Sequence, residues 1–155
     1  MAKRVFIQEI TTNRKAYYDY EIMETLVSGI QLTGNEVKAV KNGSINIVGS
    51  YVVIRNNEAF LINANIAPYQ PNNLLAKFNP LRTRKLLLKK SEINNLSQKI
   101  KKEKLTLIPL KVYNKNGLIK IEIALARHKK KFDKRETIKK RESKKRIESA
   151  QKGEY

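Results

Sequence analysis

Two short basic clusters are the part of this sequence best suited to contact a ligand. Residues 82–85 (Arg-Thr-Arg-Lys) place three cations in four positions, directly ahead of an apolar triplet. Residues 13–15 (Asn-Arg-Lys) form the second cluster, and Tyr17 and Tyr18 follow it. Lysine and arginine bind phosphate groups, whereas aromatic rings offer flat faces on which unstacked bases can lie. The combination indicates a nucleic-acid ligand.

Both features also have a plainer interpretation. Aromatic residues are common in strands, so Tyr17 and Tyr18 could equally be core or sheet residues. Lys/Arg clusters usually only keep a surface soluble, but here 33 Lys+Arg stand against 14 Asp+Glu, a formal net charge of +19. A charge of that size on a chain of 155 residues predicts a polyanionic partner. Basic side chains bind the phosphate groups, which DNA and RNA share, and not the sugar. The charge therefore does not distinguish a DNA partner from an RNA partner.

Residue types that serve catalysis or metal binding are scarce. The chain has no cysteine and a single histidine, His128, which excludes a thiolate nucleophile, a disulfide framework and a His/Cys zinc site. His128 lies in a basic run, and we interpret it as a solvated residue at a strand end, with an RNA contact as the alternative. The segment GNEVKAVKNG lacks the Walker spacing of a phosphate-binding loop. We therefore expect no enzymatic activity and no cofactor.

The basic clusters must be positioned by a framework that the hydrophobic pattern predicts to be mainly β. Strand-like segments occupy residues 18–32, 50–66 and 105–126, and hairpin turns are predicted at Asn56-Asn57 and at 114–117. After the second turn, isoleucines alternate with charged residues, which predicts a half-buried strand of an antiparallel sheet.

Two short helices are predicted between the strands. The first occupies residues 33–43, with Asn35 as the N-cap and Gly43 ending the helix at positive φ. The second occupies 91–104, with Ser91 as the N-cap and an inward-facing stripe of Ile93, Leu96 and Ile100. Together these elements predict a mainly β fold with short flanking helices. We expect residues 1–126 to form an oligonucleotide-binding (OB)-type antiparallel β-barrel.

Residues 127–155 form a basic C-terminal tail of a different character. They hold 13 basic and 5 acidic side chains. The two isoleucines of the tail, Ile138 and Ile147, lie nine residues apart, roughly 180° around a helix, so they cannot form one buried stripe. We therefore expect nothing to pack the tail onto the barrel. The prediction is a tail that is disordered alone and becomes helical against a polyanion.

Neither a signal peptide nor a membrane span is predicted. The N-terminal segment MAKRVFIQEI lacks an apolar core, and the longest apolar runs are far shorter than the ~20 residues that cross a bilayer. We expect a soluble cytoplasmic protein, a monomer with no membrane partner.

Several segments, taken in order, resemble the SmpB family, the SsrA-binding proteins of bacterial trans-translation. They are NRKAYYDYEI, GIQLTGNEVKAVKNG, SYVVIRNNEAFL, RTRKLLLKKSEI, TLIPLKVY and KKKFDKRE. The resemblance extends from about Asn13 to Arg141. Its most specific parts are NRKA, EVK, TRKLLL and DKR, in that order and at those spacings.

The resemblance implies an OB-type barrel that binds the tRNA-like part of transfer-messenger RNA (tmRNA) and delivers it to stalled ribosomes. It assigns tmRNA binding to Asn13, Arg14, Lys15, Lys38, Lys41, Arg82, Arg84 and Lys85, with Leu87 and Lys89 near that surface. The tail would occupy the decoding site and mRNA channel of the small subunit, next to its RNA. It would act there through Lys129, Lys130, Phe132, Asp133, Lys134 and Arg135. Indirect partners would be elongation factor Tu with GTP and alanyl-tRNA synthetase.

Three positions depart from the family pattern. Val27 stands where the family has a glutamate, Ala39 where it usually has a serine, and His128 in place of a glycine. A glycine can adopt positive φ, which histidine generally cannot. Either the turn at His128 does not need a glycine, or the tail leaves the barrel along another path.

Other functions fit the composition less well but stay open at this point. A ribosomal or assembly protein would share the basic barrel-and-tail design and would be found on ribosomes without tmRNA. A nucleic-acid-processing enzyme would need a clustered acidic metal site, and no pair of carboxylates is convincingly placed for one. A metal-dependent nuclease activity that is lost on substitution of Asp19 or Glu21 would support that alternative. A DNA-compacting protein would prefer duplex DNA to folded RNA.

Overall fold

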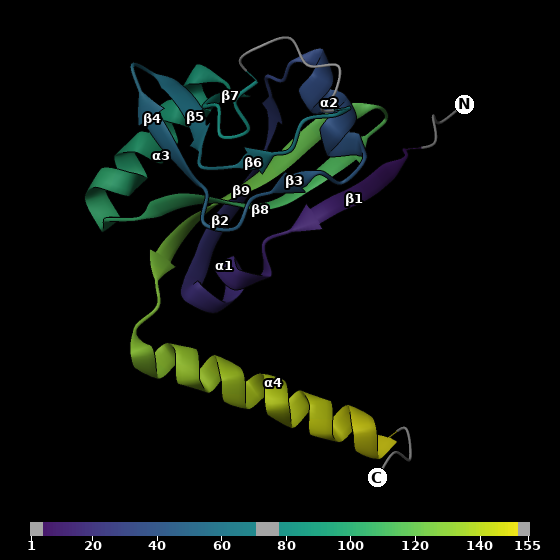
Figure 1. Ribbon diagram of the computed structural model, residues 1–155. Helices are drawn as coiled ribbons and strands as arrows, with labels where there is room; N and C mark the ends of the chain where they lie inside the picture. The colour runs from purple at the N-terminus through teal and green to yellow at the C-terminus, as the bar shows by residue number, and fades with distance from the viewer. Residues whose placement is uncertain (1–4, 71–77, 152–155) are drawn as a thin grey trace.

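The computed structural model describes residues 5–70 and 78–151, and within the last helix it describes the side chains of 134–147. The elements, in chain order, are β1 (Ile7–Thr12), α1 (Arg14–Asp19), β2 (Tyr20–Ile30), α2 (Gly34–Lys41), β3 (Ile45–Asn46), β4 (Tyr51–Arg55), β5 (Glu58–Ile62), β6 (Asn65–Ile66), β7 (Arg84–Leu87), α3 (Lys90–Glu103), β8 (Thr106–Lys115), β9 (Leu118–His128) and α4 (Lys131–Gln151). Figure 1 shows α4 extending away from the rest of the molecule. Residues 7–128 are called the β-domain below.

The long strands form a closed ring. Their order is β8-β4-β5-β7-β2-β9, and β9 pairs back with β8, while β1 is added at the edge of β8. Every pairing is antiparallel. A second, two-stranded sheet joins β3 to β6. The predicted mainly β, antiparallel fold class is confirmed.

Both predicted hairpin turns are present. Between β4 and β5, Asn56 and Asn57 have φ of 52° and 60°. Between β8 and β9, Asn116 and Gly117 have φ of 52° and 86°. Two successive residues at positive φ give the backbone twist that joins tightly paired strands, and asparagine and glycine adopt that conformation at least cost.

The ring encloses the main core, and a smaller core lies outside it. Ile119, Ile121 and Ile123 are buried as the alternation predicts, together with Leu61 and Leu107. On the outer face of β8 and β9, a second cluster joins α1 to both strands through Ala16, Ile108, Leu110, Ala124 and Ala126. Because α1 covers this patch, β9 is buried on both faces from Ile123 to Ala126, where the sequence predicts a half-buried strand.

The helices differ from the prediction in number and in their caps. α1 and the edge strand β1 were not predicted. The N-cap of α2 is Thr33, not Asn35, which instead exchanges two hydrogen bonds with the backbone of Tyr69. The N-cap of α3 is Lys89, not Ser91, and its backbone N–H donates to Glu92. Gly43, at φ 83°, follows α2 as predicted.

The predicted tail, residues 127–155, contains the helix α4 (Lys131–Gln151). Ile138 and Ile147 are 40% and 58% exposed, so they form no buried stripe, as predicted. The expectation that nothing packs the tail onto the β-domain is wrong at its start, because Lys129, just before α4, and Lys134, near the beginning of α4, contact α1. No helix within the described residues is long and apolar enough to cross a membrane.

A buried ion pair joins α2 to β7 inside the β-domain. Glu36 and Arg84 are 1% and 0% exposed, and the closest N–O distance between the carboxylate and the guanidinium is 2.5 Å. Arg84 also donates to the backbone carbonyls of Ala64 and Pro80, at 2.7 and 3.0 Å. Arg82, at the rim, bonds the other oxygen of Glu36 at 2.5 Å. The Glu36–Arg84 pair therefore links α2 and β7 to the segments that contain Ala64 and Pro80.

The charge on Glu36 is maintained by its partners. Burial alone would raise the pKa of Glu36, but hydrogen bonds from Arg82, the Thr33 backbone and Arg84 outweigh burial and lower the pKa below its ordinary value. A lowered pKa in the folded state means that the ionised carboxylate stabilises the fold. That contribution is complete above the pKa of an unfolded glutamate and is lost as the pH falls through the folded value.

We expect Glu36→Gln to lower the free energy of unfolding by about 3–5 kcal/mol at neutral pH, because it leaves the Arg84 charge buried without its partner. Urea unfolding followed by circular dichroism measures this. The deficit should shrink as the pH drops below about 4.3, the ordinary glutamate pKa. The matched control is Glu58→Gln, whose exposed pair with Lys85 should contribute about 0–1 kcal/mol. Equal stability of the two variants at neutral pH would contradict a structural role for Glu36.

Candidate nucleic-acid interface

The first basic cluster is carried by α1, which Asn13 fixes to the ring. The side-chain carbonyl of Asn13 caps α1 by accepting from the Ala16 N–H at 3.2 Å. Its amide group donates to the carbonyls of Pro109 and Ile47, and its backbone N–H donates to Leu110 at 2.7 Å. The register of β8 against β9 shifts between Pro109 and Lys111, so the carbonyls of this irregular stretch are available to Asn13.

Asn13 is therefore a residue that positions its neighbours. Its side chain is 3% exposed and its polar atoms are engaged within the protein. Arg14 and Lys15, which follow on α1, are both exposed. The cluster 13–15 thus combines one buried anchor with two cations that face solvent.

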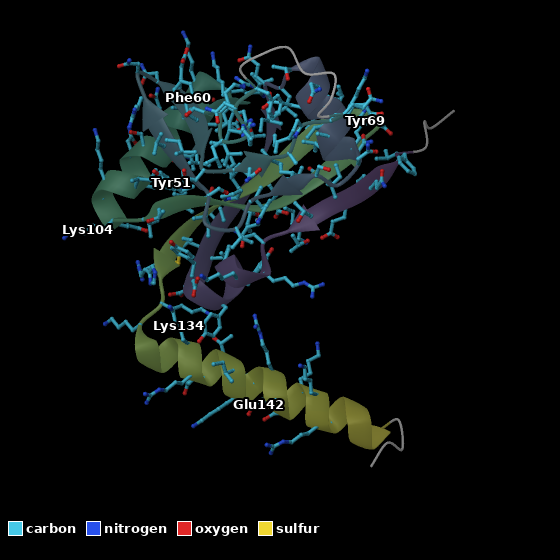
Figure 2. The ribbon with its side chains drawn as sticks, in the orientation of Figure 1. Tyr51, Phe60, Tyr69, Lys104, Lys134 and Glu142 are labelled. Carbon is cyan, nitrogen blue, oxygen red and sulfur yellow. The ribbon has the colours of Figure 1, made fainter. Side chains whose placement is uncertain are left out.

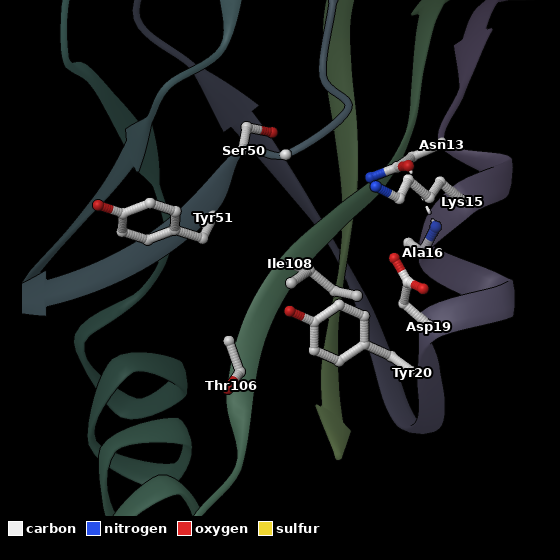
Figure 3. A pocket seen from close by; sticks show the side chains of 10 residues that line it. Asn13, Lys15, Ala16, Asp19, Tyr20, Ser50, Tyr51, Thr106 and Ile108 are labelled. Atoms are coloured by element: carbon white, nitrogen blue, oxygen red, sulfur yellow. Dashed lines mark hydrogen bonds between the residues drawn. The ribbon is translucent and has the colours of Figure 1, made fainter. Parts of the chain in front are cut away.

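A cavity of about 300 Å³ opens beside α1 (Figure 3). Lys15 and Asp19 of α1 and Tyr20 of β2 line it on one side, and Ser50 and Tyr51 line it on the other. The cavity therefore presents a cation and two aromatic rings from different elements. This is the combination expected of a site that takes a phosphate and an unstacked base.

Tyr17 and Tyr18, the tyrosines singled out in the sequence, do not line this cavity. Tyr17 packs on the small core beneath α1, in agreement with the core interpretation. The Tyr18 ring lies beneath the Lys134 ammonium, with Nζ 5.7 Å from the ring centroid. Tyr20 and Tyr51, which line the cavity, were missed because one directly follows a helix that was not predicted and the other begins a strand far along the chain.

The second basic cluster divides between the interior and the surface. Arg84 is fully buried against Glu36, so its guanidinium has a structural role. Arg82 is 42% exposed in its side chain and bonds Glu36 with one end of its guanidinium. Lys85 forms an exposed pair with Glu58 at 3.2 Å. The sequence signal for this arrangement was Thr33-x-x-Glu36, a capping-box pattern that places a glutamate at the first turn of α2.

The other residues assigned to tmRNA binding lie near these segments. Lys38 and Lys41 are exposed on α2, and the Lys38 Nζ lies 5.9 Å from the centroid of the Tyr69 ring. Leu87 is 57% exposed, and with Lys85 and Lys89 it lines a cavity of about 380 Å³ between β7 and the start of α3. Residues 84–87 are extended and form the strand β7.

In Figure 1, α1 and α2 lie at opposite ends of the β-domain. The assigned residues on α1 are thus separate from those on α2, whereas Lys85, Leu87 and Lys89 line one cavity between β7 and α3.

The tail residues assigned to the ribosome differ in their contacts and exposure. The Lys129 Nζ donates to the Tyr17 carbonyl and the Thr137 hydroxyl, and Lys134 pairs with Asp19 at 3.3 Å. Lys130 and Arg135 are exposed. The side chains of Phe132 and Asp133 lie outside those that the structure describes.

The departures from the family pattern fall at defined places. His128 is the last residue of β9 and is extended, so the chain needs no glycine there to reach α4. Its ring packs edge-on against Tyr20 with the centroids 4.9 Å apart. Val27 is 50% exposed on β2 opposite Glu122 of β9, and Ala39 is buried within α2.

Comparison with known proteins agrees with this arrangement. The family described as "SmpB protein" matches residues 10–153 of the chain. The SsrA-binding protein of Caldicellulosiruptor saccharolyticus is 51% identical over 137 residues, covering 88% of this chain and 86% of the relative. That of Persephonella marina is 50% identical over 147 residues, covering 95% of this chain and 96% of the relative.

A solved structure, "tmRNA-SmpB: a journey to the center of the bacterial ribosome", contains a similar chain. It is 42% identical, with a TM-score of 0.64, and the match covers 81% of this chain and 85% of that one. The family match spans the α1 cavity, the buried Glu36–Arg84 pair and the basic surfaces around them. With relatives of such identity over nearly the whole chain, this protein belongs to the SmpB family of SsrA-binding proteins.

Proposed function

We propose that this protein is a non-enzymatic RNA-binding adaptor that binds the tRNA-like domain of tmRNA and accompanies it to stalled ribosomes in the cytoplasm. The observation that carries the proposal is the similarity of the whole chain to SsrA-binding proteins and to a chain of a tmRNA-SmpB structure. The exposed cations Arg14 and Lys15, beside a cavity with two tyrosines, support an RNA ligand. Asp19, the candidate metal ligand of the enzyme alternative, is instead paired with Lys134.

The proposal divides the work between two parts of the chain. The β-domain binds folded RNA through its exposed cations and cavities, because these groups are held on a rigid ring of strands. The tail enters the decoding site and mRNA channel of the small subunit, where its excess positive charge meets ribosomal RNA. Elongation factor Tu with GTP and alanyl-tRNA synthetase act on the RNA rather than on this chain.

Removal of the tail tests the division. A chain ending at His128 keeps all of β9, so we expect it to bind a tRNA-like tmRNA fragment tightly and to outcompete duplex DNA. Its slope of log K against log salt should fall by roughly 0.7–0.9 for each phosphate group that the tail neutralises in the full chain. Fluorescence anisotropy across a salt series measures both quantities. Peptide tagging on stalled ribosomes should be abolished.

The opposite pattern would support another function. Equal binding of DNA and RNA that disappears with the tail would indicate a general polyanion binder. Stoichiometric recovery on ribosomes from cells without tmRNA would indicate a ribosomal protein.

The cations of α1 should contribute as phosphate ligands. In the full chain, Arg14→Gln with Lys15→Gln should lower the slope of log K against log salt by about 1.4–1.8 if both side chains contact phosphates. The matched control removes the same charge from the exposed Lys101 and Lys102 of α3. If the control lowers the slope equally in the same titration, the cations act through overall charge and the site assignment is wrong.

Tyr51 should contribute by stacking. It is 38% exposed at the cavity wall, so Tyr51→Ala should weaken binding of the tRNA-like fragment by about 1–3 kcal/mol with an unchanged salt slope. Tyr51→Phe keeps the ring and should bind as the parent protein does. Equal losses in the two variants would assign the effect to the hydroxyl group instead of the ring.

A further inference from the structure

A cavity of about 310 Å³ opens on the outer face of β4 and β5. Val52 of β4 and Leu61 of β5 point into the ring and are buried in the main core. Successive side chains of a strand point to opposite faces, so the residues next to these two face outward. We call this hollow the β4–β5 cavity. The residues that line it include Val53, Arg55, Glu58, Phe60, Ile62 and Thr83.

Phe60 lies at the centre of this outer face. The antiparallel register places Val53 of β4 on one side of Phe60 and Lys85 of β7 on the other. Phe60 is half-buried and lines the cavity, so part of its ring is accessible from outside. A ring exposed in this way is a face on which an unstacked base can lie. Figure 2 shows Phe60 at the end of the β-domain opposite α4.

The charges around the cavity favour an anionic ligand. Glu58 is the one acidic residue that lines it, and its carboxylate is paired with Lys85 at 3.2 Å. Arg55 stands opposite Glu58 in the register and is exposed. Within the described part of the chain Arg55 forms no ion pair, so its guanidinium can bind a ligand. A planar guanidinium is well suited to phosphate, which it binds through two N–H groups.

We propose that the β4–β5 cavity binds one unpaired nucleotide of an RNA strand, with the Phe60 ring against the base and the Arg55 guanidinium on a phosphate. A base inside a duplex is already stacked on both sides and cannot reach the ring, so the nucleotide must be unpaired. The choice of RNA over another polyanion rests on the proposed function, whereas the shape and charge of the cavity do not.

The cavity also gives the basic cluster 82–85 a more definite role. Arg84 points into the β-domain and is fully buried. Its two neighbours face outward, since Thr83 lines the cavity and Lys85 stands beside Phe60. An RNA strand bound in the cavity would therefore run next to the outward-facing part of this cluster, whose positive charge attracts its phosphates.

Fluorine NMR reads the Phe60 ring directly. The chain has four phenylalanines, so labelling with para-fluorophenylalanine gives few signals, and each Phe→Leu substitution assigns one of them. We expect the Phe60 signal to shift when the full chain is titrated with a single-stranded oligouridylate of about six nucleotides. Phe6, which is 62% exposed and outside the cavity, should keep its signal unchanged.

Variants of the two residues separate stacking from charge. Phe60→Leu keeps an apolar side chain but removes the flat face, and it should weaken oligouridylate binding about 5- to 150-fold, the effect of one stacked base. Phe60→Tyr keeps the ring and should bind as the parent protein does. Arg55→Gln should lower the slope of log K against log salt by about 0.7. Lys102→Gln, on an exposed position of α3, removes the same charge and should leave the slope and the Phe60 signal unchanged.

Three results would overturn the proposal. They are a Phe60 signal that stays in place at saturating oligouridylate, a Phe60→Leu variant that binds as tightly as Phe60→Tyr, and an equal shift of the Phe60 signal with duplex RNA. Arg55→Gln lies at an exposed position, so it tests the cavity even where a change at Phe60 lowers stability. A slope that falls equally with Arg55→Gln and Lys102→Gln would remove Arg55 from the site.

Two further titrations identify the source of the nucleotide. Weaker binding of Phe60→Leu to the tRNA-like fragment assigns the nucleotide to tmRNA, and weaker binding to isolated small ribosomal subunits alone assigns it to ribosomal RNA. Unchanged affinity for both would overturn a role of the cavity in RNA binding. The oligouridylate response needs no tmRNA, so the affinity of the parent protein for the tRNA-like fragment reports on the proposed function separately.

Discussion

The buried ion pair between Glu36 and Arg84 is the interaction on which the rest of the β-domain depends. The chain has a net charge of +19, yet Arg84 is fully buried within it. Burying a guanidinium without a partner costs several kcal/mol, so the position of Glu36 determines where Arg84 can lie. Because Arg84 also bonds the carbonyls of Ala64 and Pro80, the same pair fixes the segments that surround β7.

Acidic residues thus divide the cations of this protein into two classes. Glu36 and Asp19 pair with cations at the junctions between elements, where the pairs are buried or half-buried. The cations without such partners, of which Arg14 and Lys15 are clear examples, face solvent on elements that the internal pairs hold in place. RNA binding depends on both classes, since an exposed cation is useful only where its helix or strand is fixed. The basic clusters of the sequence therefore mix structural and ligand-binding roles.

Local signals in the sequence were sufficient to predict the hairpin turns and the mainly β class. The alternation of apolar with charged residues, and the preference of asparagine and glycine for positive φ, are properties of neighbouring residues. The isoleucines of β9 and the turn at Asn116 are examples. The roles of Asn13 and Arg84 could not be predicted in the same way, since their partners lie tens of residues away, at Pro109 and Glu36. A pattern of charges shows how many cations there are but not which of them face inward. The contact between the tail and α1 was missed for the same reason, because it depends on polar pairs and not on an apolar stripe.

Chemical modification of lysines, read by mass spectrometry with and without the tRNA-like domain of tmRNA, tests this division of the cations most directly. We predict that Lys15 is modified readily in the free protein and becomes protected when RNA binds. Lys129 should be protected already without RNA, because its ammonium bonds Tyr17 and Thr137, and Lys101 should stay reactive in both states. Protection spread evenly over all lysines, or Lys129 as reactive as Lys101 in the free protein, would contradict the account.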